Sequence, residues 1–180
     1  MIFHSIYVQP INKIIAIMFI ALIVWTIVGI CVQKWKNARS LWCVINTVLS
    51  VVALAGILHY TIFYRTSGGT HTVPFIRTIE HIQQQPELLR EMLMNAFLFF
   101  PFGLTMPYAV KTRVEKNKNI TLITVLSSLV LSGCIEFVQY VFNLGDAELS
   151  DIIMNTAGAA IGTLSYVVSC KVCNIRRTQS

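Results

Sequence analysis

Hydrophobic residues along the chain form five long runs, at about residues 14–32, 41–64, 88–110, 121–142 and 152–171. A helix that crosses a bilayer needs about 20 mostly apolar residues, and each run has roughly this length. The connections between the runs are short, apart from residues 65–87. The pattern therefore predicts an all-α fold, a polytopic membrane bundle of about five transmembrane helices.

The long connection predicts one further element. It begins polar and then shows apolar residues at the spacing of one helix face, namely Phe75, Ile76, Ile79 and Ile82. Such a segment is typical of a short helix that lies in the membrane interface. The first run, in contrast, is longer than the apolar region of an ordinary signal peptide, and no small-x-small cleavage pattern precedes Gln33. We expect it to be a retained transmembrane helix.

Composition excludes an ordinary soluble protein, because 55% of the residues are hydrophobic and only 12% are charged. The excess of 14 Lys and Arg over 8 Asp and Glu would suit nucleic acid or anionic lipid in a soluble chain. In a membrane chain it more often reports topology, so no nucleic-acid partner is expected. The five cysteines lie in or at the ends of apolar runs, where they act as small apolar residues rather than as a disulfide set.

The basic residues also predict the orientation. Ten of them fall on the side of residues 33–40, residues 111–119 and the C-terminal tail, against four on the other side. Because Lys and Arg accumulate in cytoplasmic loops, the N-terminus is predicted outside and the C-terminus in the cytoplasm. We divide the chain into a first helix with its cytoplasmic loop (1–40), a four-helix membrane domain (41–173) and a cytoplasmic tail (174–180).

This orientation places a set of polar residues at the outer-leaflet ends of different helices, namely Arg65, Asn95, Glu136, Gln139, Asp151 and Asn155. A carboxylate well inside a span, as Glu136 is, must be paired, hydrated or protonated, and marks a functional site by default. For the others a structural role stays open. Asn95 can bridge helices, Arg65 can reach the interface with a snorkelling side chain, and Asp151 or Ser150 can cap the fifth helix.

Two stripes follow from helical spacing, because residues three and four apart share a face. Glu136, Gln139 and Tyr140 form one stripe, and Asp151 and Asn155 form another. The second stripe continues in Gly158 and Gly162, a small-xxx-small pattern that permits close packing of helices. The fourth helix is the expected neighbour of these glycines, because the loop between the fourth and fifth runs is short.

Five segments of the chain resemble those of a known protein family: YTIFYR (60–65), VPFIRTI (73–79), NAFLFFPFG (95–103), IEFVQ (135–139) and SDIIMNTAGAAIG (150–162). They resemble, in the same order, the VanZ-like family of small bacterial membrane proteins, and the resemblance covers about residues 58–165. It implies a role in the cell envelope and a bacterial cell-membrane location, and the family takes its name from resistance to the glycopeptide teicoplanin. It also implies that the six polar positions named above match the polar positions of the family.

Three hypotheses follow. In the first, the outer-leaflet site binds or modifies a lipid head group or a lipid-linked cell-wall precursor; the chemistry falls to Glu136 and Asp151, and the binding residues are Arg65, Asn95, Gln139 and Asn155. There Arg65 would hold an anion and Glu136 would act as general acid or base. Oxygen ligands of Asp146, Glu148 and Asp151 could hold a divalent cation, although no metal or other cofactor is assigned. In the second, a non-catalytic protein binds the antibiotic or alters its access to its target. The third, a carrier with Glu136 as proton relay, lacks the internal repeat of an alternating-access protein.

Overall fold

The structure, a computed structural model, describes residues 11–63, 72–73, 86–111, 117–144 and 147–178. Its long helices are α2 (Ile11–Lys34), α3 (Lys36–Leu58), α5 (Pro86–Val110), α6 (Asn117–Phe142) and α7 (Leu149–Thr178). Five helical spans are long and apolar enough to cross a membrane, so the predicted all-α membrane bundle is confirmed. The interfacial helix expected around residues 75–82 lies outside the described residues.

Two small elements accompany the helices. A single π-helical turn, η1 (His59–Phe63), follows directly after α3. The two-residue strands β1 (Thr72–Val73) and β2 (Ala147–Glu148) pair in parallel, with Thr72 opposite Ala147 and Val73 opposite Glu148. This pairing was not predicted, and it joins the long connection to the start of α7.

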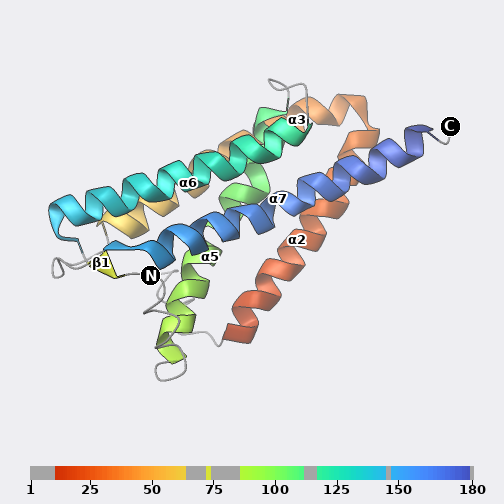
Figure 1. The fold of residues 1–180 in the computed structure, drawn as a ribbon. Coiled ribbons are helices and arrows are strands. Elements are labelled where there is room, and N and C mark those ends of the chain that lie inside the picture. The colour runs from red at the N-terminus through yellow and green to blue at the C-terminus, as the bar shows by residue number, and fades with distance from the viewer. Residues whose placement is uncertain (1–10, 64–71, 74–85, 112–116, 145–146, 179–180) are drawn as a thin grey trace.

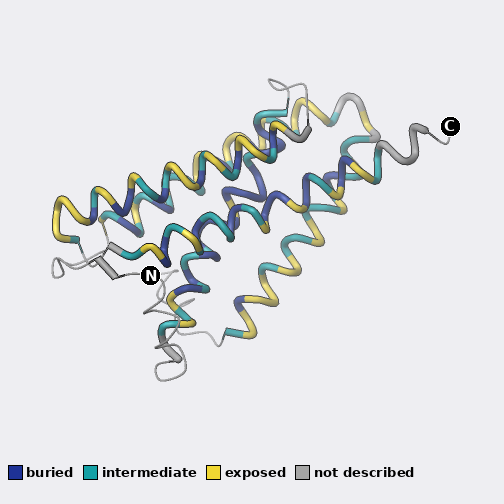
Figure 2. The backbone as a smooth tube through the Cα atoms, in the orientation of Figure 1, coloured by how far each residue is buried: buried dark blue, intermediate teal, exposed yellow. Residues whose placement is uncertain are grey.

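Helix α5 is the buried centre of the bundle (Figures 1 and 2). It contacts each of the other four long helices, whereas α2 on the outside has few buried residues. The helix continues through Pro101 and Pro107. Consecutive long helices run in opposite directions (Figure 1), so the end of α3, the start of α5, the end of α6 and the start of α7 lie towards the same side. The apolar side chains that the bundle leaves exposed are those that a bilayer would cover.

Helices α5 and α7 cross at backbone contact. A Cβ atom at Gly158 would overlap the backbone of Ala96, and one at Gly103 would overlap the backbone of Ala159. At Gly162 it would lie 2.6 Å from the backbone oxygen of Phe100. The predicted close approach at the glycines of α7 is therefore confirmed, but the neighbour is α5 and not α6. The short loop does make α6 and α7 neighbours. A contact between two helix backbones needs a small residue on each helix, however, and the small residue that faces α7 is Gly103 of α5.

Two clusters of buried side chains flank this crossing. The first joins α3, α5, α6 and α7 through Ile57, Leu98, Phe99, Phe102, Ile135 and Ala159. The second lies towards the opposite end and contains Tyr108, Ile120, Tyr166 and Cys170, with Trp25 and Trp42 packed against it. Its aromatic rings form a chain of contacts from Trp25 to Trp42, Tyr108 and Tyr166, with centroids 5.2 to 5.7 Å apart. Rings from α2, α3, α5 and α7 thus hold this end together.

Candidate functional site at the facing ends of α6 and α7

Helices α6 and α7 run antiparallel, and two hydrogen bonds fix their register. The side-chain nitrogen Nδ2 of Asn155 donates to Ser132 Oγ at 2.8 Å. One turn closer to the loop, the backbone N–H of Glu148 donates to Glu136 Oε2 at 3.0 Å. Because Glu136 follows Ser132 by one turn and Asp151 precedes Asn155 by one turn, both carboxylates lie at the same level between the helices.

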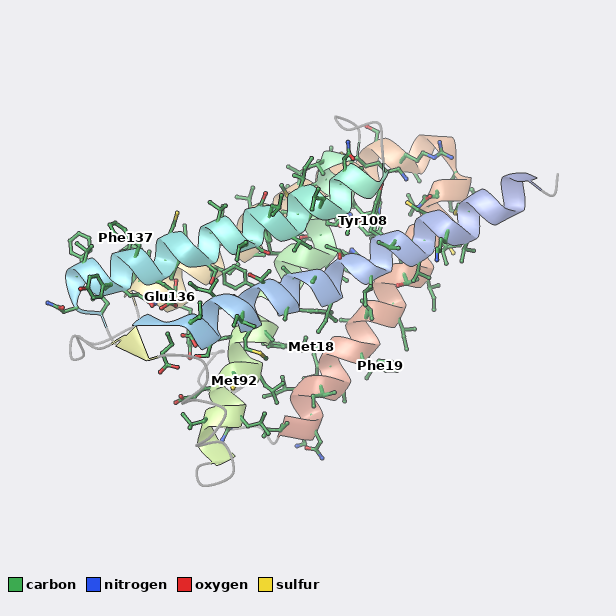
Figure 3. The ribbon with its side chains drawn as sticks, in the orientation of Figure 1. Met18, Phe19, Met92, Tyr108, Glu136 and Phe137 are labelled. Carbon is green, nitrogen blue, oxygen red and sulfur yellow. The ribbon has the colours of Figure 1, made fainter. Side chains whose placement is uncertain are left out.

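These side chains are deeply buried. Glu136 is 6% exposed, Asp151 9% and Asn155 3%. Figure 3 shows Glu136 on the side of α6 that faces α7, whereas its neighbour Phe137 points away from the bundle. Carboxylates at such a position are costly in a membrane and are kept where they serve a ligand, a proton or an ion. The arrangement brings together two of the residues for which a chemical role was predicted.

Gln139 attaches the end of α3 to this site. Its Nε2 donates to the backbone oxygen of Thr61 at 2.9 Å, and both residues are buried. Thr61 belongs to η1, and single π-helical turns shift the direction in which backbone groups point and are frequent at functional sites. The hydrogen bond therefore fixes where the chain leaves α3, next to the linker that carries Arg65.

The end of α6 is closed by a left-handed residue. Asn143 has φ 53°, the backbone N–H of Leu144 donates to the oxygen of Gln139 at 2.9 Å, and that of Asn143 donates to Tyr140 at 3.5 Å. This is the Schellman arrangement, with asparagine in the position that glycine usually takes. It ends α6 at Phe142 and turns the chain back, so that Glu148 can reach Glu136.

At the start of α7 the Ser150 hydroxyl donates to the Glu148 carboxylate at 2.7 Å. Asp151 lies in the first turn, where the positive end of the helix dipole favours a carboxylate. The Glu148 carboxylate is thus held at the start of α7 by Ser150, while its backbone N–H binds Glu136.

The remaining predicted residues have different outcomes. Asn95 is half-buried on α5, and within the part of the chain that the structure describes its side chain makes no hydrogen bond. Arg65 and Asp146 lie outside the described residues. Tyr140 is 53% exposed and does not belong to the buried stripe of Glu136 and Gln139, which corrects the predicted face of α6. Among the described residues, no group of three His, Cys, Asp or Glu side chains could hold a metal ion.

Sequence reasoning missed two contributors, Ser132 and Thr61. Both are buried, and both supply an oxygen to a predicted site residue. A signal for Ser132 exists in the spacing of α6, where every fourth residue is polar and buried: Thr124, Ser128, Ser132 and Glu136. Thr61 contributes a backbone oxygen, which no side-chain pattern can reveal.

Known proteins resemble this chain in sequence. The sequence profile described as VanZ/LLP1 matches residues 16–170. The protein named VanZ from Enterococcus faecium is 34% identical over 92 residues, which are 49% of this chain and 51% of that protein. The chain therefore spans about half the length of the curated relative it matches, and no solved structure matches it. Since the profile extends over most of the sequence, the chain belongs to the VanZ/LLP1 family.

Proposed function

We propose that this multi-pass membrane protein has an outer-leaflet site that binds or modifies the head group of a lipid or of a lipid-linked cell-wall precursor, and that this activity contributes to teicoplanin resistance. The observation that supports the proposal is that Glu136 and Asp151 are both buried, at one level between α6 and α7. Charged groups cost free energy in a bilayer, so a fold that orders two of them at one level has a use for them. The name of the family supports the link to the glycopeptide.

The orientation is part of the proposal. The side of the membrane that holds the site carries four of the fourteen Lys and Arg residues, and the opposite side carries ten. By the positive-inside rule this places the site outside and the C-terminus in the cytoplasm. Fusions to the C-terminus of the full chain test it. A green fluorescent protein fusion should fluoresce and an alkaline phosphatase fusion should be inactive; the reverse pattern would place the site in the inner leaflet.

Within this site we assign proton transfer to Glu136, as general acid or base, with Asp151 as the second carboxylate. Gln139 and Asn155 orient the ligand, together with Asn95 from α5. Arg65 would hold the phosphate through its fork of donors. The geometry supports this for Glu136, because the bond from the Glu148 backbone fixes its carboxylate between the two helices.

Glu136→Gln is the sharpest test, because glutamine keeps an oxygen that can accept from Glu148 and removes the charge. We expect a teicoplanin-susceptible host that expresses this variant to lose the protection given by the wild type, at equal membrane amounts of protein. Glu91→Gln makes the same chemical change at an exposed position of α5 and should keep protection. Full protection by Glu136→Gln would exclude proton transfer by this residue.

That outcome would favour the second function, a non-catalytic protein that binds the antibiotic or hinders its access. One contact points in this direction, because Glu136 Oε2 already accepts from the backbone of Glu148 and so has a structural role. In that case labelled teicoplanin should bind the purified protein directly. Absence of binding, together with full protection by Glu136→Gln, would exclude both proton transfer by Glu136 and direct capture of the antibiotic.

A further inference from the structure

Asn155 carries a buried oxygen that the fold leaves without a partner. The residue is 3% exposed, and its Nδ2 donates to Ser132 Oγ at 2.8 Å. Its Oδ1 is fully buried, and no atom of the described chain donates to it. A buried acceptor without a donor destabilises a protein, and hydrocarbon supplies no water to compensate it. Such an atom at a binding site marks the place of a missing donor.

The position of Asn155 connects this oxygen to the carboxylates. Asn155 and Asp151 share one face of α7 at a spacing of one turn, and Ser132 and Glu136 share one face of α6 in the same way. The Asn155–Ser132 hydrogen bond therefore forms the layer directly below the level of Glu136 and Asp151. The unpartnered oxygen thus lies one turn deeper in the bundle than the two acids.

The site is rich in acceptors. The donors that the structure shows at these levels bind other protein atoms. Asn155 Nδ2 donates to Ser132, Gln139 Nε2 donates to Thr61, the Glu148 backbone donates to Glu136, and the Ser150 hydroxyl donates to Glu148. None of these donors reaches Asn155 Oδ1, which is left without a donor among the described residues. A buried amide oxygen of this kind attracts a group that offers hydrogen.

Resting on the head-group site proposed above, we propose that Asn155 Oδ1 accepts a hydrogen bond from a hydroxyl or amine of the bound head group. The ligand then lies with its donor end towards Asn155 and its phosphate away from it. A head group without N–H or O–H, such as choline, cannot make this contact. The site selects among lipids by this donor.

Two pairs of lipids with identical acyl chains test the selection on the purified full chain, with native mass spectrometry as the readout. Phosphatidylethanolamine and phosphatidylcholine are both zwitterionic, and only the first has an N–H donor. Phosphatidylglycerol and phosphatidylmethanol are both anionic, and only the first has hydroxyl groups. We expect the donor-bearing lipid of at least one pair to bind roughly tenfold more tightly, as one hydrogen bond to a buried group would give. The pair that discriminates identifies the donor as an amine or a hydroxyl.

Asn155→Leu removes the acceptor at similar volume and should bring the members of that pair to equal affinity. Retained discrimination in Asn155→Leu would show that another residue reads the head group and would overturn the proposal. If this variant does not fold, the wild-type comparison still decides, because equal binding within both pairs overturns the donor contact and leaves the head-group site intact. Absence of binding for all four lipids would overturn the head-group site as well.

Discussion

Glu136 and Glu148 are joined by a hydrogen bond from the backbone N–H of Glu148 to Oε2 of Glu136, 3.0 Å long. An acid inside the fourth spanning helix thereby holds the residue that directly precedes the fifth helix. The same side chain that is proposed to serve the ligand also shapes the site. Loss of function after a change at Glu136 can therefore have two causes, and the variants must separate them.

Glu136→Ala and Glu136→Gln make this separation. Alanine leaves the N–H of Glu148 without its acceptor, and we expect a loss of about 1–2 kcal/mol in the free energy of unfolding. Glutamine keeps an oxygen at the same reach, so its loss should be clearly smaller. The thermal midpoint of the detergent-solubilised protein measures both. Equal midpoints for the two variants would show that the hydrogen bond does not stabilise the start of α7.

The crossing of α5 and α7 gives a second prediction. Gly158→Ala places a methyl group on the backbone of Ala96, which can move only if the two helices separate. We expect a strong loss of folded protein in the membrane, because backbone contact leaves no flexible side chain to adjust. Gly133→Ala is the matched control on α6, where a Cβ would meet nothing within 4 Å.

Fluorescence-detected gel filtration of the two glycine variants measures this difference. Gly133→Ala should elute as a sharp peak at wild-type yield, since alanine favours a helix over glycine by about 1 kcal/mol. A Gly158→Ala protein with the yield and thermal midpoint of Gly133→Ala would contradict the close crossing of α5 and α7.

The sequence was sufficient to predict the fold because bilayer thickness fixes the length of an apolar run. It also brought Glu136 and Asp151 together, since the short loop makes α6 and α7 antiparallel neighbours. It could not identify the partner of Gly158 and Gly162. A small-xxx-small pattern indicates a close contact, but the matching Gly103 lies on another helix whose place depends on the whole bundle.

The details of the site depend on geometry that side-chain spacing does not determine. Tyr140 follows Glu136 by four residues, yet the buried face of α6 runs through Ser132, Ile135 and Gln139, which turns the tyrosine outward. A tyrosine near a helix end commonly lies at the membrane interface, where its hydroxyl reaches water. The strands β1 and β2 are two residues long, too short for an alternating pattern to show.

The left-handed residue at the end of α6 gives a third prediction. Asn143 has φ 53°, a conformation that asparagine and glycine tolerate and that β-branched residues strongly disfavour. Asn143→Gly should preserve the thermal midpoint, whereas Asn143→Val should cost about 1–2 kcal/mol. Because this turn leads the chain back to Glu136, the valine variant should also reduce teicoplanin protection at equal protein amounts. Equal stability of the valine and glycine variants would contradict a left-handed turn at this position.

The hydroxyl network at the other end of the bundle allows stability to be changed without touching the site. The Tyr108 hydroxyl lies 3.0 Å from Ser169 Oγ and 3.4 Å from Ser165 Oγ, and Ser169 also donates to the backbone oxygen of Thr26. Tyr108→Phe removes one link between α5 and α7 and keeps the ring in place. We expect a loss of about 0.5–1 kcal/mol, the range for hydrogen bonds between membrane helices.

Tyr140→Phe is the control for this change, because it removes a hydroxyl from an exposed ring and should leave the thermal midpoint unchanged. Tyr108→Phe should keep full teicoplanin protection when its membrane amount equals that of the wild type, since the network lies at the end of the bundle opposite Glu136. Reduced protection at equal amounts, with the lower midpoint, would mean that the two ends of the bundle are coupled. The site would then depend on the packing of α7 along its whole length, and Glu136 and Asp151 alone would not account for the function.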